Sequence, residues 1–469
     1  MTKVLPPPPE PSTGKPRWTE EVRRANRRLS PARPKPLRVE TPVCWVTIFF
    51  LIAAASVPAQ EAVQNMLLDD AAAAARARQM APAGAQDYSF KQGDFRLLVV
   101  PSLGLEYCDN VNLADTGALD DFILMPSVAM TASYPFTAKN LLYLDFTVGY
   151  DQYLKHSRIS SIQLNSSSGT GISLDVALKK IALNFHDAAT YAQGSGGNAF
   201  VLNTANGGVA NTADYGTFQN DAGLTATWDL NQAGFVLGYD HQNVLATSGQ
   251  FDAINHAAEM LAARNSFRAH PKVELGWEAT ADFTAYEDNL LNDYNAYTVG
   301  PYVMFRPGQF LTVTARGGYV YYQFQSTSST IKTASQNGWY GGVNITHQPT
   351  AALSYSVEFG HELQPGIQTD LLEDWYVRPS LTWKPVKDLA VAALLFYEHG
   401  HQGPGSVGTL PGADASGFDW YGCAVNLQYV LTSRLVLSLD YRLTFRSSNT
   451  PDDSYQQNLA LLQLTYHFK

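Results

Sequence analysis

The sequence predicts an all-β fold, a transmembrane antiparallel up-and-down β-barrel of about eighteen strands, with sixteen as the alternative count. Apolar and polar residues alternate through almost every segment after residue 95, as in a strand with lipid on one side and water on the other. Short turns alternate with long connections between these segments. Aromatic residues make up 12% of the chain and charged residues only 16%, a composition that fits one large barrel.

The first 59 residues predict an export signal with a long basic N-terminal region. Ten Lys and Arg against four Glu give this leader a net charge of +6. The apolar stretch 43–55 is short for a helix that must span about 30 Å of hydrocarbon, and the small-residue site before Ala59 predicts cleavage there. Subtracting +6 from the whole-chain charge of −10 leaves about −16, which argues against nucleic acid as a partner.

Residues 60–94 predict a short periplasmic helix and a linker, and residues 95–469 the barrel. The helix is suggested by the alanine run 71–75, with Asp69 and Asp70 before it and Arg76 after it. In the barrel, Cys108 and Cys423 fall on opposite faces of their strands, so we expect two free thiols rather than a disulfide.

The connections predict how the strands are joined. Short turns are expected near residues 137–140, 179–180, 231, 271, 307–308, 349, 385 and 433. Long connections are expected at 108–120, 155–167, 192–214, 244–256, 287–293, 325–336, 364–371, 400–416 and 447–454. This alternation places both chain ends of the barrel on the short-turn side, which in outer-membrane barrels is periplasmic. The last strand must then pair with the first, 95–107.

Individual strands add detail to this prediction. Trp375 and Trp383 lie on the apolar face of one strand, about 19 Å apart along a membrane normal, which matches the two aromatic girdles of such barrels. Pro126, Pro301 and Pro379 interrupt strands, and we expect local bulges there because proline cannot donate a ladder hydrogen bond.

Three segments carry a resemblance to a known family. Residues 105–112 (LEYCDNVN), 121–127 (DFILMPS) and 149–154 (GYDQYL) resemble β-barrel porin family 2, over most of residues 95–468. The resemblance implies a bacterial outer-membrane barrel, in a family with some members associated with extracellular-polysaccharide loci. The ending Leu464-x-Tyr466-x-Phe468 is similar to the aromatic C-terminal signal that barrel assembly machinery recognises, although Lys469 follows it. The implied partners are outer-membrane lipid, that machinery and polysaccharide-export components.

The polar faces predict the lining of the barrel. An eighteen-strand barrel is wide enough for an aqueous channel, and charges on its wall set ion selectivity. The alternative is that these residues pair across neighbouring strands and only solvate the wall. Inward Tyr302 and Tyr376 could also stack sugars, and Arg442 with Arg446 would form a positive strip for an anionic solute. The predicted pore-lining residues are Asp145, Asp151, Asp240, Glu274, Glu278, Asp282, Arg316, Glu358, Arg378, Asp440, Arg442 and Arg446.

Motifs for catalysis, metals or cofactors do not emerge from the sequence. It contains no Gly-x-Ser-x-Gly elbow, His-Glu-x-x-His zinc motif or phosphate loop. His186 beside Asn184 is a lone inward histidine, and the acidic connection 109–121 lacks the ordered spacing of a calcium loop. We therefore expect no enzyme, no catalytic residue, no metal and no cofactor.

The sequence as a whole predicts a passive outer-membrane channel for ions or small hydrophilic solutes. The family resemblance implies a link to extracellular-polysaccharide export. A closed structural or adhesive barrel is the alternative, and a soluble exported β-protein is a further one. The long connection 192–214 is either a constriction folded into the lumen or a surface loop.

Overall fold

The computed structural model describes residues 88–137, 139–165, 171–192, 216–247, 252, 254–288, 290–328, 333–365, 370–402, 417–449 and 454–468. The expected leader, 1–59, and most of the expected periplasmic segment, 60–94, lie outside these residues. The strands are β1 (Phe90–Gln92), β2 (Phe95–Cys108), β3 (Asp121–Pro135), β4 (Leu141–Tyr153), β5 (Ser161–Asn165), β6 (Ile172–Leu178), β7 (Ile181–Ala192), β8 (Thr217–Asp229), β9 (Ala233–Ala246), β10 (His256–His270), β11 (Val273–Tyr286), β12 (Tyr294–Phe305), β13 (Leu311–Phe324), β14 (Gln336–Thr350), β15 (Leu353–Gln364), β16 (Leu372–Val386), β17 (Leu389–Gln402), β18 (Gly417–Thr432), β19 (Leu435–Ser448) and β20 (Tyr455–Tyr466), with one 3-10 turn, η2 (Ser157–Ile159).

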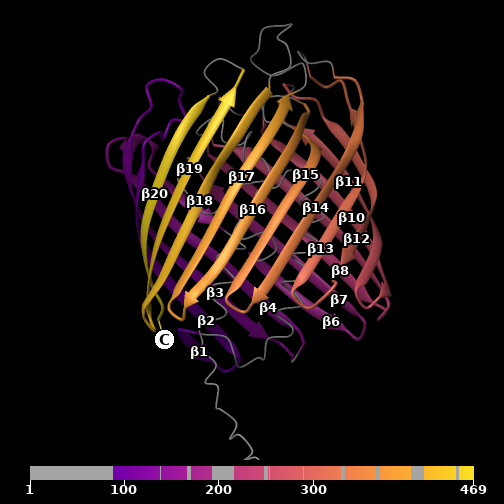
Figure 1. The fold of residues 1–469 in the computed structure, drawn as a ribbon, viewed down its shortest axis with the longest axis horizontal. Coiled ribbons are helices and arrows are strands. Elements are labelled where there is room, and N and C mark those ends of the chain that lie inside the picture. Colours follow the sequence, from indigo (N-terminus) through magenta and orange to yellow (C-terminus); the bar gives the residue numbers. More distant parts are fainter. Residues whose placement is uncertain are drawn as a thin grey trace, which may run out of the picture. The chain divides into compact units, whose positions relative to one another are not determined.

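These strands form one closed antiparallel barrel (Figure 1). Each strand pairs with its neighbours in the sequence, and β20 returns to β2, where Leu103 lies opposite Leu464. β5 and β6 occupy a single position in the wall, because both lie between β4 and β7. With β1 outside the ring, the described strands fill eighteen positions, and the predicted fold class, strand number and closure are confirmed.

Short turns and long connections gather at opposite ends of the barrel (Figure 1). All eight predicted short turns are present, from 136–140 between β3 and β4 to 433–434 between β18 and β19. The connection predicted at 155–167 is shorter than expected, because β5 already begins at Ser161 and pairs with β4. The connection predicted to constrict the lumen, 192–214, lies almost wholly outside the described residues.

The two faces of the wall differ in chemistry, as the alternation predicted. Outward apolar side chains are unusually exposed, for example Leu237 (60%) and Trp277 (57%), whereas polar residues of the interior face are buried. Trp375 and Trp383 are both exposed at opposite ends of β16. An exposed apolar band of this extent indicates a surface that meets a nonpolar environment.

The short strand β1 covers the short-turn end of the seam between β2 and β20. β20 pairs with β2 only from Ser102 to Cys108, so the first half of β2 lacks a β20 partner. β1 folds back over this edge through a turn at Gly93, with Phe90 opposite Leu97. Gly93 has a φ of +61°, a left-handed conformation that glycine adopts without strain.

The expected bulges at the strand prolines are wrong. At Pro126, Pro301 and Pro379 the strand register is the same before and after the proline. Each proline is paired with one neighbouring strand, and only the ladder with the other neighbouring strand lacks pairs at that point. The missing N–H costs one ladder contact and no extra residue is inserted. Register shifts occur instead next to short turns, between His347 and Thr350 and between Trp383 and Val386.

Within the part of the chain that the structure describes, no helix has the length and apolar character needed to cross a membrane. Cys108 is buried on the interior face, and Cys423 is half-buried; both are free thiols. Cys44 falls in the expected leader and lies outside the described residues.

Candidate functional site: the interior wall of the barrel

One sector of the interior wall carries carboxylates without cationic side chains. The strands β3 to β9 contain no Lys or Arg. Their interior face presents Asp151, which accepts a hydrogen bond of 2.8 Å from Gln163, and Asp221, which accepts one of 2.8 Å from Gln242. Neutral amides therefore hold these carboxylates in place, and no Lys or Arg of the same strands pairs with them.

A glycine opens a path for one contact across this sector. Asp240 on β9 and His186 on β7 are separated by β8, yet Oδ1 of Asp240 lies 2.6 Å from Nε2 of His186. A Cβ at Gly223 of β8 would fall 2.8 Å from that nitrogen and would collide with the same carboxylate oxygen. Only glycine at this position leaves room for the two side chains to meet on the interior side of β8.

The histidine in this contact is fully engaged. Nδ1 of His186 lies 3.0 Å from Oδ1 of Asn184, whose amide donates to Asp175 at 2.7 Å. Ser173 lies opposite His186 in the ladder, but both ring nitrogens already have partners, so neither is available to deprotonate that hydroxyl. A hydrolase arrangement is not formed here.

The rest of the wall carries the arginines. Arg264 donates to Glu278 at 3.0 Å and lies over the ring of Tyr302, 4.9 Å from its centroid. Arg378 repeats this arrangement: it donates to Glu398 at 2.7 Å, and its guanidinium lies 4.1 Å from the ring centroid of Tyr376. A guanidinium thus covers one face of each tyrosine that the sequence suggested as a sugar-stacking surface.

Two further arginines lie on β19 beside an apolar patch. Arg446 lies over Phe418, 4.2 Å from the ring centroid, and Arg442 donates to Gln457 at 3.4 Å. The patch consists of Leu372, Phe396, Phe418 and Trp420, which are buried on the interior faces of β16 to β18. Cationic and aromatic side chains are therefore adjacent on one wall, between β16 and β19.

These two kinds of wall face each other. In a ring of eighteen positions, the strands opposite β4–β9 are β14–β18, which carry Arg378 and Lys384. Arg316 on β13 and Arg442 on β19 flank them. The interior wall is thus acidic without Lys or Arg on one side, and on the other side it combines cationic and acidic side chains.

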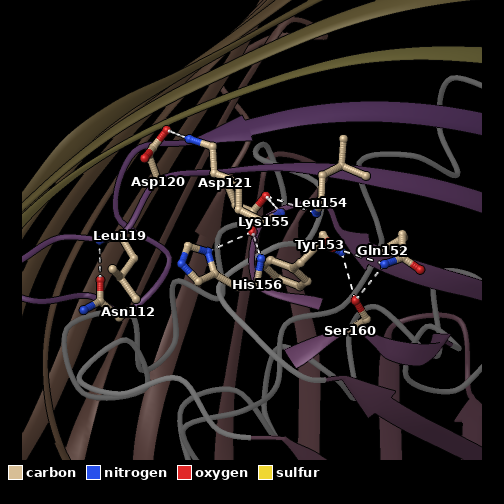
Figure 2. A network of polar contacts seen from close by, with 10 residues as sticks. All are labelled: Asn112, Leu119, Asp120, Asp121, Gln152, Tyr153, Leu154, Lys155, His156 and Ser160. Carbon is tan, nitrogen blue, oxygen red and sulfur yellow. Dashed lines mark hydrogen bonds and ion pairs between the residues drawn. The ribbon is translucent and has the colours of Figure 1, made fainter. Parts of the chain in front are cut away.

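At the long-loop end, the connection 154–160 is fastened to the first residue of β3 (Figure 2). The carboxylate of Asp121 accepts backbone N–H groups from Leu154 at 3.1 Å, Lys155 at 2.9 Å and His156 at 2.8 Å. Lys155 also bonds to Asp120, and this hydrogen bond holds the pKa of the Asp120 carboxyl below its usual range and raises the pKa of Lys155. The mouth of the barrel on this side is therefore a defined polar rim.

No family model matches this chain, and no curated protein matches it. Among solved structures, the chain is similar to a BenF-like porin from Pseudomonas fluorescens Pf-5, with 10% identity over 79% of this chain and 98% of that one and a TM-score of 0.44. It is also similar to Pseudomonas aeruginosa OccK2 (OpdF) in complex with glucuronate, with 9% identity over 80% and 98% of the two chains and a TM-score of 0.43. Acinetobacter baumannii OccAB4 gives 12% identity, 79% and 98% coverage and a TM-score of 0.43.

The twelve residues predicted as pore lining all belong to barrel strands, on the face opposite the exposed apolar side chains. Some are paired, as the alternative expectation held: Glu278 binds Arg264, Asp440 accepts from Asn426 at 2.6 Å, and Asp145 accepts from Thr131 at 3.3 Å. Others lie in aromatic surroundings: Asp282 accepts from Thr284 and, at 3.4 Å, from Tyr294, and the hydroxyl of Tyr302 donates to Glu274. Glu358 lies directly opposite Arg378 in the ladder.

Sequence reasoning missed several charged residues of the same face. Glu106 on β2 is fully buried, and Glu398, Arg264 and Asp221 complete the pairs and sectors described above. The period-two alternation that found Glu278 would also have found Arg264 and Glu398, because each lies on the interior face of its strand. Within the described residues no group of three or more His, Cys, Asp and Glu side chains could hold a metal ion.

Proposed function

We propose that this protein is a bacterial outer-membrane channel for the passive passage of ions and small hydrophilic solutes. The observation that carries the proposal is the inversion of the two faces: exposed apolar side chains cover the outside of a closed barrel, and charged side chains occupy its interior. A water-soluble barrel would bury its apolar face instead. A barrel of eighteen positions is also in the size range that leaves an aqueous channel.

The twelve interior residues named above are proposed to line this channel. The arginine strip of Arg442 and Arg446 beside Phe418 and Trp420 supplies cationic and aromatic contacts on one wall. A small organic anion finds both there, while cations are attracted to the carboxylate sector around Asp221 and Asp240. The channel is therefore proposed to pass ions of both signs along different walls.

The proposed partners follow from the membrane location. Outer-membrane lipid surrounds the apolar band, and barrel assembly machinery would recognise the last strand with Tyr466 and Phe468. The link to polysaccharide export rests on the family resemblance alone, and the closed structural or adhesive barrel is the competing function.

Planar-bilayer recording of the purified mature protein tests the proposal. We expect stepwise conductance that grows with salt concentration. A protein that migrates as a folded, heat-modifiable barrel and yet gives no conductance steps would establish the closed barrel instead. A protein that stays in the aqueous phase on detergent partitioning would contradict the membrane location itself.

A further inference from the structure

A recurring polar cluster lies on the outer, apolar face of the barrel. On β9, the outward residues Tyr239 and His241 both bind Glu259 of β10: the tyrosine hydroxyl donates at 2.6 Å, and Nδ1 of the histidine lies at 2.9 Å. His241 is directly opposite Glu259 in the ladder. Nε2 of His241 lies 3.0 Å from the amide nitrogen of Asn243. The cluster is one carboxylate held between a phenol and an imidazole.

The same cluster occurs again on β17 and β18. Tyr397 donates to Asp419 at 2.8 Å, and Nδ1 of His399 lies 2.9 Å from the same carboxylate oxygen, Oδ1, which leaves Oδ2 for an external donor. His399 and Asp419 are directly opposite each other, as in the first cluster. The sequence spacing is also the same, Tyr-x-His on the earlier strand with an acidic residue on the next.

A third cluster replaces the tyrosine with tryptophans. Nε2 of His361 on β15 lies 2.8 Å from Glu373 of β16. The imidazole ring lies 4.0 Å from the ring of Trp339 and 4.5 Å from that of Trp375, measured between centroids. Phe359 precedes this histidine by two residues, so the aromatic-x-His spacing is kept.

All three clusters lie at the same end of the barrel. His241, His361 and His399 each stand within a few residues of the long-loop end of their strands, which end at Ala246, Gln364 and Gln402. The carboxylates are half-exposed: the side chains of Glu259, Glu373 and Asp419 are 47%, 50% and 42% exposed. On the short-turn side of the clusters, the outward positions include exposed apolar side chains such as Leu237, Val357 and Leu395, so the clusters border the apolar band.

We propose that these three clusters form a collar that binds the sugar headgroups of outer-leaflet glycolipid. The proposal rests on the membrane location proposed above, in which the long-loop end faces outward. Half-exposed carboxylates accept hydrogen bonds from sugar hydroxyls, and the adjacent Trp and Tyr rings offer faces for the C–H side of a sugar ring. Three carboxylates disfavour phosphate groups, so the hydroxyls and not the phosphates of the headgroup are recognised.

The test compares lipid retention by native mass spectrometry of the detergent-purified protein. The variant Glu259→Gln, Glu373→Gln, Asp419→Asn removes the charge of each cluster and keeps its shape. The control variant His347→Gln with Tyr355→Phe alters an outward polar pair at the short-turn end, where Nδ1 of His347 and the hydroxyl of Tyr355 lie 2.6 Å apart. The probes are lipid A, dephosphorylated lipid A, phosphatidylethanolamine and a soluble glucosamine disaccharide.

We expect the wild-type protein and the control variant to retain both forms of lipid A about tenfold better than phosphatidylethanolamine, and the triple variant to lose this preference. Equal retention of lipid A by the triple variant would overturn the proposal. Loss of binding on dephosphorylation would show that phosphate is recognised, and equal competition by the free disaccharide would show that the collar takes soluble sugar; both outcomes overturn it. Heat-modifiable mobility and unchanged conductance of the triple variant separate a failed collar from a failed channel.

Discussion

Gly223→Ala is expected to destabilise the barrel because it closes the gap through which His186 and Asp240 meet. The new methyl group would lie 2.6 Å from the carbonyl oxygen of Tyr239 and 2.8 Å from Nε2 of His186. Neither distance is tolerable for a carbon atom, and the carbonyl belongs to the strand backbone, so both side chains and the strand must shift.

The expected decrease in the free energy of unfolding is the sum of three contributions. Loss of the 2.6 Å contact between His186 and Asp240 costs about 1.5–3 kcal/mol, as for a hydrogen bond to a charged group. Overpacking against the β9 backbone costs about 1–3 kcal/mol. Replacing glycine by alanine within a strand returns about 0.5–1 kcal/mol of backbone entropy. The expected loss is therefore about 2–5 kcal/mol.

The assay is urea unfolding of the refolded barrel in lipid vesicles, followed by tryptophan fluorescence and by heat-modifiable gel mobility. Gly308→Ala is the matched control, because a Cβ at Gly308 meets nothing within 4 Å. In an Asp240→Ala background the penalty of Gly223→Ala should shrink by the hydrogen-bond term, since that contact is already absent. If Gly223→Ala unfolds at the same urea concentration as Gly308→Ala, the contact across β8 does not stabilise the barrel.

Two further predictions concern charge. Replacing Arg442 and Arg446 by Ser should lower the permeability of chloride by about fourfold for each arginine, since a guanidinium about 5 Å from a passing anion contributes about 0.8 kcal/mol in water. The ratio of chloride to potassium permeability therefore falls, and reversal potentials in a KCl gradient measure it. Arg434→Ser in an exposed turn is the control, and an unchanged ratio would leave the two arginines as wall residues only. Lys155→Met should raise the pKa of Asp120 back to its usual range, which NMR titration would follow. Because that pKa is lowered in the folded protein, the stabilisation by this contact is present above the ordinary Asp pKa and is lost as pH falls through the lowered one. A pKa of Asp120 that does not move would exclude Lys155 as its cause.

The sequence was sufficient for the strand number and the closure because both depend on local signals. Period-two alternation marks each strand, and turn residues mark each end, so the position of the last strand beside residues 95–107 followed from counting alone. The strand β1 at the short-turn end of the seam between β2 and β20 was not predictable, since it is three residues long and too short to show alternation.

The contacts of the interior wall were less accessible to sequence reasoning. Alternation tells which face a residue occupies. The pairing of Arg264 with Glu278 depends in addition on the register between β10 and β11, and a shift of one residue at the short turn would separate the two side chains. The contact of His186 with Asp240 depends on a glycine in a third strand. Pro379 shows the opposite error: the local rule predicted a bulge, but the flanking ladders hold the register across the missing pairs.

The seam has a consequence for how the chain folds. Ser89, immediately before β1, donates a hydrogen bond of 2.9 Å to the carbonyl of Phe468, and the two residues are 379 positions apart. Among the hydrogen bonds of the described residues this one spans the largest sequence separation, so the intervening strands bring its two partners together when they are ordered. The contact between Ser89 and Phe468 therefore reports the completion of the ring, and cross-linking of cysteines placed at these two positions would time that step of barrel assembly.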